Sequence, residues 1–352
     1  MRTSLVRIVL LALAAVAAGA TGAPRTAVAA PETLLLAIWS NYLPESVIAE
    51  FEKEANCTVE IPWNYGSNDE LLAKLQTKST GFDLAVPSDV ILEPLVAQGL
   101  LEALEKDKLP NLVHLDPAFA KRQADREGAW SVPYTWGTVG IAWRTDRVKK
   151  PVDSWSVFSD AAIADGNAYL LEEARDVVGA ALLFRGHDLN STAPGDLAHA
   201  RETLLAWRKG LKGYTGEVKD HLLSGEAWLI QAYNGDVAQA MQEKPGKYGF
   251  VVPKEGGILW IDNLVIPKGS PNKALAHKFI DYVLRPAVAA KISNGIRYAV
   301  ANKDAIPLVD AAIRKDPVIY APDDVRSRLH QHRDLGAELK KVTDLWAEVR
   351  GS

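Results

Sequence analysis

The chain has little sulfur and no excess of basic residues. Its 352 residues include one cysteine, Cys57, and two methionines, so an internal disulfide is excluded. Lysine and arginine number 40 against 44 aspartates and glutamates, which argues against nucleic acid as a partner. We interpret Cys57, in the segment CTVEI, as a small buried apolar residue of a strand.

Long hydrophobic runs are also scarce. The one candidate, Ile8 to Ala18, follows two arginines and precedes the small residues AVA at 27–29. It is shorter than the roughly 20 residues of a membrane helix, and no later segment could span a bilayer. We therefore interpret residues 1–29 as a cleavable export signal. Its removal leaves 37 basic and 44 acidic residues, a net charge of −7 that permits a cationic partner.

Motifs of catalysis and of cofactor binding are missing. The chain contains no G-x-S-x-G elbow, Walker loop or H-E-x-x-H pair. Its seven histidines are scattered, and only His330 and His332 lie close in the sequence. We interpret that pair as a solvated surface feature. We expect no enzyme, no cofactor and no metal site.

What is present is an alternation of short apolar runs with amphipathic stretches, the pattern of an α/β protein. Strands are predicted at 33–39, 57–61 and 82–87, each followed by a helix, and these units imply a mostly parallel sheet. An extended segment at 130–143 precedes a second series of such units. The pattern predicts two α/β halves joined at extended segments. Ligands of such sheets bind at the carboxyl ends of the strands.

The stretch GGILWIDNLVIP (256–267) predicts a buried strand, yet it carries a carboxylate, Asp262. Trp260 lies two positions away, so the ring and the acid share one face of the strand. A buried unpaired carboxylate is costly. A cationic group is expected to meet it.

Other strand ends carry aromatic and acidic residues too. Single residues have simpler explanations: Glu173, Asp176 and Asp236 suit the first turn of a helix, and Ser88 suits a helix cap. Together they form rings between carboxylates, which suits a flexible chain with an ammonium group at each end. The candidate ligand-binding residues are Trp39, Ser40, Tyr42, Ser88, Glu173, Asp176, Tyr233, Asp236, Trp260, Asp262 and Tyr298.

These blocks identify a resemblance. The segments IWSNYLPESVIAEFEKE, FDLAVPSDVILEPLVAQGLL, VPYTWGTVGIAW, EEARDVV, AYNGDVAQA and VPKEGGILWIDNLVIP resemble the periplasmic polyamine-binding proteins of ATP-binding-cassette (ABC) importers, the receptors for putrescine and spermidine. The resemblance covers nearly the whole mature chain. It implies a type II periplasmic binding protein, with two hinge-linked α/β lobes that close on a polyamine.

The resemblance assigns ligand contacts to the eleven candidates, with departures at three positions. Family members usually have an indole where this chain has Tyr233. Putrescine receptors tend to have an acid where this chain has Asn41, and spermidine receptors have an aromatic residue where it has Val90. Neither subclass is matched cleanly, so the choice between putrescine and spermidine stays open.

The resemblance also implies lobes, partners and location. Lobe one comprises residues 30–140 and 262–305, and lobe two comprises 141–261 and 306–352. Hinges are expected near Trp136–Gly140, Asp262 and Asn302. The implied partners are a polyamine and a membrane permease, and the protein is expected to be a periplasmic monomer without stable membrane insertion.

Binding proteins of this fold take other classes of ligand as well, and each class requires different residues at the cleft. An anion receptor requires arginines or helix N-termini at the cleft, and a ferric-iron receptor requires paired tyrosines with few other rings. A quaternary-ammonium receptor, with an aromatic cage, is the nearest alternative. The carboxylates count against it because a quaternary nitrogen donates no hydrogen bond. A sensor without transport function stays open.

Overall fold

The computed structural model describes residues 32–77, 80–120, 125–160 and 162–351. The predicted export signal, residues 1–29, lies outside these residues. The strands are β1 (Glu32–Ala37), β2 (Cys57–Trp63), β3 (Leu84–Ala85), β4 (Ser131–Arg144), β5 (Ala168–Leu171), β6 (Leu211–Thr215), β7 (Leu229–Tyr233), β8 (Tyr248–Val251), β9 (Gly257–Val265), β10 (Ala299–Val300) and β11 (Leu329–Gln331).

Helices alternate with these strands, as the sequence pattern predicts. They are α1 (Glu45–Ala55), α2 (Asn68–Leu75), α3 (Leu92–Ala97), α4 (Pro117–Ala120), α5 (Ala174–Phe184), α6 (Pro194–Arg208), α7 (Val218–Ser224), α8 (Asn234–Glu243), α9 (Lys273–Val283), α10 (Pro286–Ile296), α11 (Ala311–Arg314), α12 (Asp323–Arg326) and α13 (Leu339–Gly351). None of the helices in the described ranges is long and apolar enough to cross a membrane.

The strands join into one mixed sheet with the order β2-β1-β3-β9-β4-β7-β5-β6. β10 and β8 pair with β4, and β11 pairs with β9. The prediction of a mostly parallel sheet was wrong. β1–β2, β1–β3, β5–β6, β5–β7 and β9–β11 are parallel, but every other contact of β4 and β9 is antiparallel.

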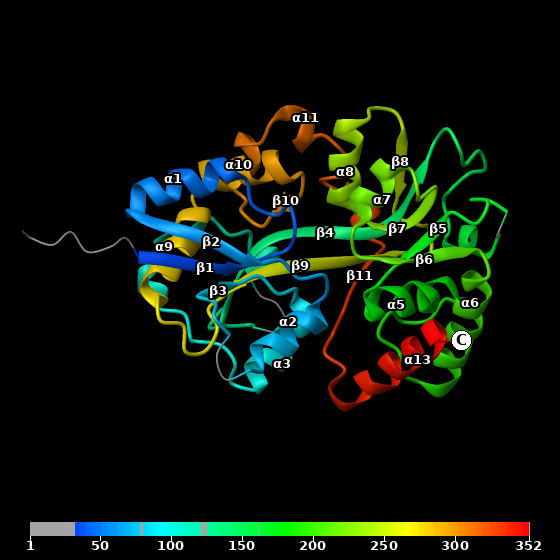
Figure 1. Cartoon of the computed structure of the whole chain (residues 1–352), viewed down its shortest axis with the longest axis horizontal. Helices are drawn as coiled ribbons and strands as arrows, with labels where there is room; N and C mark the ends of the chain where they lie inside the picture. Colours follow the sequence, from blue (N-terminus) through cyan, green and yellow to red (C-terminus); the bar gives the residue numbers. More distant parts are fainter. Residues whose placement is uncertain (1–31, 78–79, 121–124, 161, 352) are drawn as a thin grey trace, which may run out of the picture. The chain divides into compact units, whose positions relative to one another are not determined.

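The long strands β4 and β9 explain this difference. They lie side by side through the middle of the sheet (Figure 1) and pair from Ser131↔Val265 to Val139↔Ile258. β4 pairs with β10 over its first half and with β7 and β8 over its second. The two expected α/β halves therefore share one hydrogen-bonded sheet, because these two strands belong to both.

Helix packing follows the apolar faces of the sequence. In α1, Val47 and Phe51 are buried, and the Phe51 ring meets Phe279 of α9 edge-on, with centroids 5.0 Å apart. In the later half, α13 packs against α5 and α6. Cys57, at the start of β2, is a buried free thiol, as predicted.

The side chain of Ser88, the serine that follows the third predicted strand, does not act as a helix cap. β3 is only two residues long, and Ser88 precedes a short 3-10 helix, Asp89–Ile91. Its side chain makes no capping bond and instead donates to Asp262, with Oγ 2.6 Å from Oδ1. The simple explanation of Ser88 as a helix cap was therefore wrong: its hydroxyl is directed at the carboxylate of Asp262 on β9 and accepts no backbone N–H of the 3-10 helix.

Asp83 is a buried carboxylate with a structural role. It accepts hydrogen bonds from the backbone N–H of Leu35 at 2.9 Å, from Ser270 Oγ at 2.9 Å, and from the backbone and side chain of Asn272 at 3.1 and 3.2 Å. These bonds connect β1 to the segment before α9. They satisfy the charge of the carboxylate inside the protein.

Replacing Asp83 with alanine should therefore lower the free energy of unfolding by roughly 2–3 kcal/mol, because buried donors lose their acceptor. Urea unfolding would measure this. The exposed Asp153, changed to alanine, is the control and should leave stability within about 0.5 kcal/mol of the wild type. Equal stability of the two variants would contradict the structural role.

Candidate functional site

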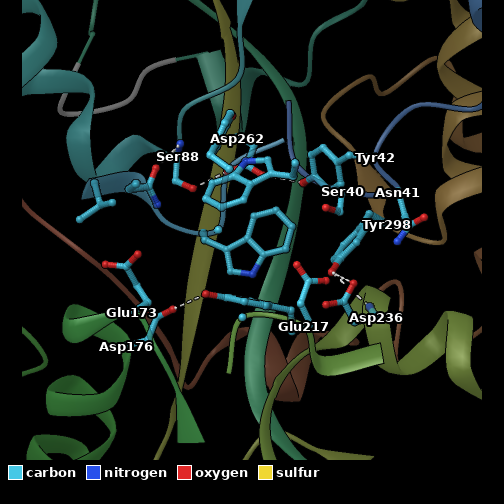
Figure 2. A pocket seen from close by; sticks show the side chains of 18 of the residues that line it. Ser40, Asn41, Tyr42, Ser88, Glu173, Asp176, Glu217, Asp236, Asp262 and Tyr298 are labelled. Carbon is cyan, nitrogen blue, oxygen red and sulfur yellow. Dashed lines mark hydrogen bonds between the residues drawn. The ribbon is translucent and has the colours of Figure 1, made fainter. Parts of the chain in front are cut away.

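A cavity of about 950 Å³, including its open mouth, lies beside β4 and β9. All eleven sequence-predicted residues line it, as do Asn41 and Val90. Figure 2 shows three groups of polar side chains around it: Ser88 with Asp262, Asp236 with Glu217 and Tyr298, and Glu173 with Asp176. The structure thus brings together residues from widely separated parts of the chain.

The first group surrounds Asp262 in β9, which is 4% exposed. Its Oδ1 accepts from Ser88, and its Oδ2 accepts from the Tyr42 hydroxyl at 2.6 Å. Thr135 Oγ1 lies 2.6 Å from the same Tyr42 hydroxyl. Since Tyr42 gives its proton to Asp262, Thr135 donates to Tyr42. Among the described residues, no lysine, arginine or histidine forms an ion pair with Asp262.

This environment disfavours the charged form of the acid. Burial raises the pKa of Asp262 to about 7, and the hydrogen bonds from Ser88 and Tyr42 lower it in part. Burial and the charge of Asp262 raise the pKa of Tyr42 far above its ordinary value, so this phenol remains a donor. Two neutral hydroxyls hold the carboxylate in place but do not balance its charge.

Aromatic rings form a continuous wall next to this acid. Trp260 meets Tyr298 at 5.2 Å between centroids and Tyr233 at 6.3 Å, both edge-to-face. Tyr298 in turn meets Tyr42 at 5.3 Å. Such perpendicular pairs are favourable beyond the area they bury. The wall offers ring faces and edges of one indole and three phenols to a bound molecule.

The second group lies where Tyr298 meets the start of α8. The Tyr298 hydroxyl donates to Asp236 Oδ1 at 3.1 Å and accepts from the Asp236 backbone N–H at 3.1 Å. Burial raises the pKa of Asp236 to about 7, the bond from Tyr298 lowers it, and the nearby charge of Glu217 raises it further. Asp236 therefore does more than stabilise the helix dipole: it faces the cavity.

The third group contains Glu173 and Asp176 at the start of α5. Burial and the charge of Asp176 raise the pKa of Glu173 to about 8, and a hydrogen bond from the Asn68 backbone N–H lowers it in part. Asp176 Oδ2 accepts from the Tyr233 hydroxyl at 3.2 Å. Its Oδ1 lies 2.9 Å from His332 Nε2.

The interpretation of His332 as a solvated surface residue was wrong. Its side chain is 5% exposed and contacts the buried Asp176, whereas His330 is exposed. Arg175 Nη2 lies 3.4 Å from His332 Nδ1, and an arginine can only donate, so Nε2–H donates to Asp176. Burial lowers the pKa of His332, and the Asp176 bond raises it in part. No local pattern predicts this contact, because it joins positions 156 residues apart.

Several other residues of the cavity were not predicted from the sequence. Glu217 and Asp220 follow β6, Asp89 follows Ser88, and Arg175 and Lys219 are the two permanent cations. Glu217 also follows a strand, so the strand-end rule could have found it. Lys219 pairs with Glu243 at 2.9 Å, and Arg175 donates to Asn190 and to a backbone carbonyl. With seven carboxylates against two engaged cations, the cavity is electronegative and suits a cation.

In the part of the chain that the structure describes, no three histidine, cysteine, aspartate or glutamate side chains are placed to hold a metal ion. The arrangement offers oxygen acceptors and aromatic faces. These are the groups that bind organic ammonium ions.

Fold and cavity together define a class of protein, a type II periplasmic binding protein with a mixed α/β sheet at its centre. The model of a family described as bacterial extracellular solute-binding protein matches residues 46–321, and the chain belongs to this family.

The chain is also similar to named proteins of several bacteria. The chain is 35% identical to the putrescine-binding periplasmic protein PotF of Escherichia coli, over 92% of this chain and 93% of that protein. It is 32% identical to a spermidine/putrescine-binding periplasmic protein of Haemophilus influenzae, over 92% and 90%. A solved structure assigned as a spermidine/putrescine ABC transporter from Listeria monocytogenes is 32% identical, with a TM-score of 0.85 and coverage of 91% and 99%. The resemblance seen in the sequence is thereby confirmed.

The raised pKa of Asp262 predicts how stability depends on pH. The folded protein keeps this proton up to about pH 7, whereas an unfolded aspartate loses it near its ordinary value of 3.8. The folded state therefore holds more protons between these values, and this contribution to stability falls as the pH rises through that window. The Asp262→Asn variant should lack it.

Thermal unfolding of the ligand-free protein and of Asp262→Asn across about pH 4 to 8 would measure the effect. The difference in stability, variant minus wild type, should grow with pH up to about 7 and then level off. A difference that is constant with pH would show that Asp262 titrates normally.

Proposed function

We propose that the protein is the substrate-binding component of an ABC importer for polyamines, putrescine or spermidine or both. It binds its ligand without chemical change. Relatives that are 30% or more identical over most of their length carry the names of putrescine- and spermidine-binding proteins. The observation that carries the proposal is Asp262, a buried carboxylate that two neutral hydroxyls orient and that no cation of the described chain balances.

A ligand ammonium would supply the missing charge. Charge-assisted hydrogen bonds of this kind contribute roughly 1.5–3 kcal/mol each. Asp236 and Glu173 offer further acceptors in the other two groups, and Trp260 and Tyr298 cover the alkyl chain between them. A quaternary ammonium remains the alternative ligand, favoured by the ring wall. It has no N–H for three acceptor groups, so the polyamine fits better.

Closure of two lobes would complete the site. Lobe one, residues 30–140 and 262–305, supplies Asp262 and Tyr298, and lobe two, residues 141–261 and 306–352, supplies Trp260 and Asp236. The change of partners along β4, from β10 at Thr135 and Trp136 to β7 at Val139, supports a hinge near Trp136–Gly140. Asp262 and Asn302 are the other proposed crossings.

Contacts between these two sets of residues support a closed state. Tyr298 shares its hydroxyl with Asp236, and Gln239 Nε2 donates to the Ile296 carbonyl at 2.7 Å. A ligand that binds both lobes favours the closed state because only that state offers all the contacts.

The function also implies a location and partners. An exported monomer in the periplasm, released from the signal at 1–29, would present its closed lobes to a membrane permease. The names of the periplasmic relatives support this location.

Calorimetric titration of the unfolded, ligand-stripped and refolded protein is the direct test. Putrescine, cadaverine, spermidine and choline would be added in separate titrations. We expect binding of micromolar affinity or tighter for at least one polyamine, and the ranking would settle the subclass that Asn41 and Val90 leave open. Binding of choline alone would favour the quaternary-ammonium alternative. Binding of none by a correctly refolded protein would overturn the proposal.

The Asp262→Ala variant should bind the preferred polyamine more weakly by at least about 1.5 kcal/mol, because a charge-assisted bond is lost. Asp262→Asn, which keeps the shape but not the charge, should lose nearly as much. The matched control is Glu172→Ala, since Glu172 is exposed, precedes Glu173 and does not line the cavity. Unchanged affinity in both Asp262 variants would refute its role.

A further inference from the structure

Two rings of the cavity wall rest on bare backbone. A Cβ added to Gly235, the second residue of α8, would lie 2.3 Å from Cε1 and Cζ of Tyr298 and 2.4 Å from its Cδ1. A Cβ added to Gly137 in β4 would lie 2.3 Å from Cζ2 of Trp260. Both separations are far shorter than a van der Waals contact, so any other residue would displace the rings.

The backbone conformation does not require glycine at position 235. This residue lies in the first turn of a helix and has no positive φ, and glycine is a poor helix former. The requirement is therefore one of space: only a residue without a side chain lets the ring of Tyr298 approach α8.

The ring of Tyr298 also cannot yield easily. It is 4% exposed and lies between Tyr42 and Trp260. Its hydroxyl is shared with the carboxylate and the backbone N–H of Asp236. A Cβ on Gly235 would press the ring away from α8, against the other rings of the wall, and would pull its hydroxyl from Asp236.

We propose that Gly235 is a specificity-determining position. By setting how close Tyr298 lies to α8, it sets the length of the cavity between Tyr298 and the acids of α5. This inference rests on the proposed function and names which feature of the site selects among polyamines. The bare backbone at Gly235 leaves room for a longer amine, and a side chain there would shorten the site.

The Gly235→Ala variant tests this by calorimetric titration with putrescine and with spermidine. We expect the variant to bind spermidine at least about tenfold more weakly than the wild type does, as for an overpacked site. Its affinity for putrescine should fall less. Gly195→Ala is the matched control, since Gly195 is likewise the second residue of a helix, α6, and a Cβ there meets nothing within 4 Å. It should bind as the wild type does.

A second variant separates ring displacement from general damage to the fold. When Gly235→Ala is added to Tyr298→Ala, the double variant should bind spermidine as tightly as Tyr298→Ala alone, because no ring remains to be displaced. An additional loss there, or an unchanged ratio of spermidine to putrescine affinity in Gly235→Ala, would overturn the proposal.

Near-ultraviolet circular dichroism of the ligand-free proteins reads the packing of the rings without any ligand. Gly235→Ala should alter this spectrum, whereas Gly195→Ala should not. If the wild type binds no polyamine, the proposed function fails, yet an altered spectrum would still support the ring displacement. An unaltered spectrum would overturn it.

Discussion

The antiparallel pairing of β4 with β9 holds the candidate site together. This pairing brings Thr135 opposite Asp262 and Gly137 opposite Trp260, so backbone hydrogen bonds position the acid, the threonine and the indole. β4 and β9 are also the strands that belong to both halves of the sheet. The cavity is lined by residues from both parts of this shared sheet, among them Asp262 of β9 and Tyr233 of β7.

Buried acids in this protein serve two different purposes. Asp83 and Asp125 are surrounded by donors; Asp125 accepts from three backbone N–H groups and from the Ser131 hydroxyl. From the residues that the structure describes, Asp262 receives two hydroxyl bonds and no backbone N–H bond, and burial raises its pKa to about 7. Burying the charged form of Asp262 therefore costs stability that hydrogen bonds do not fully offset, whereas four hydrogen bonds stabilise the buried Asp125. Such a cost is typical of functional sites, where a ligand completes the interactions.

The packing of the ring wall also depends on the residues behind the rings. Aromatic rings need precise support to present their faces to a ligand, and here the support is partly the absence of side chains. Trp260 lies on Gly137 and Tyr298 on Gly235. The shape of the cavity is therefore determined by residues that contribute no chemistry of their own.

Local patterns in the sequence determined the class of fold and much of the site. Apolar runs alternating with amphipathic stretches predicted the strands and helices, because period and length reflect burial directly. An acid in mid-strand singled out Asp262, since local structure offers no reason for a charge there. Both inferences depend only on residues that are close together in the chain.

Only the tertiary structure decided which side chains meet. The order of strands, the antiparallel course of β4 and β9 and the contact of His332 with Asp176 depend on pairings between distant segments. The period of a strand is the same in parallel and antiparallel sheets, so the pattern could not distinguish them. The role of Ser88 could not be predicted from its neighbours either, because the carboxylate that accepts its hydrogen bond lies on a strand 174 residues further along the chain.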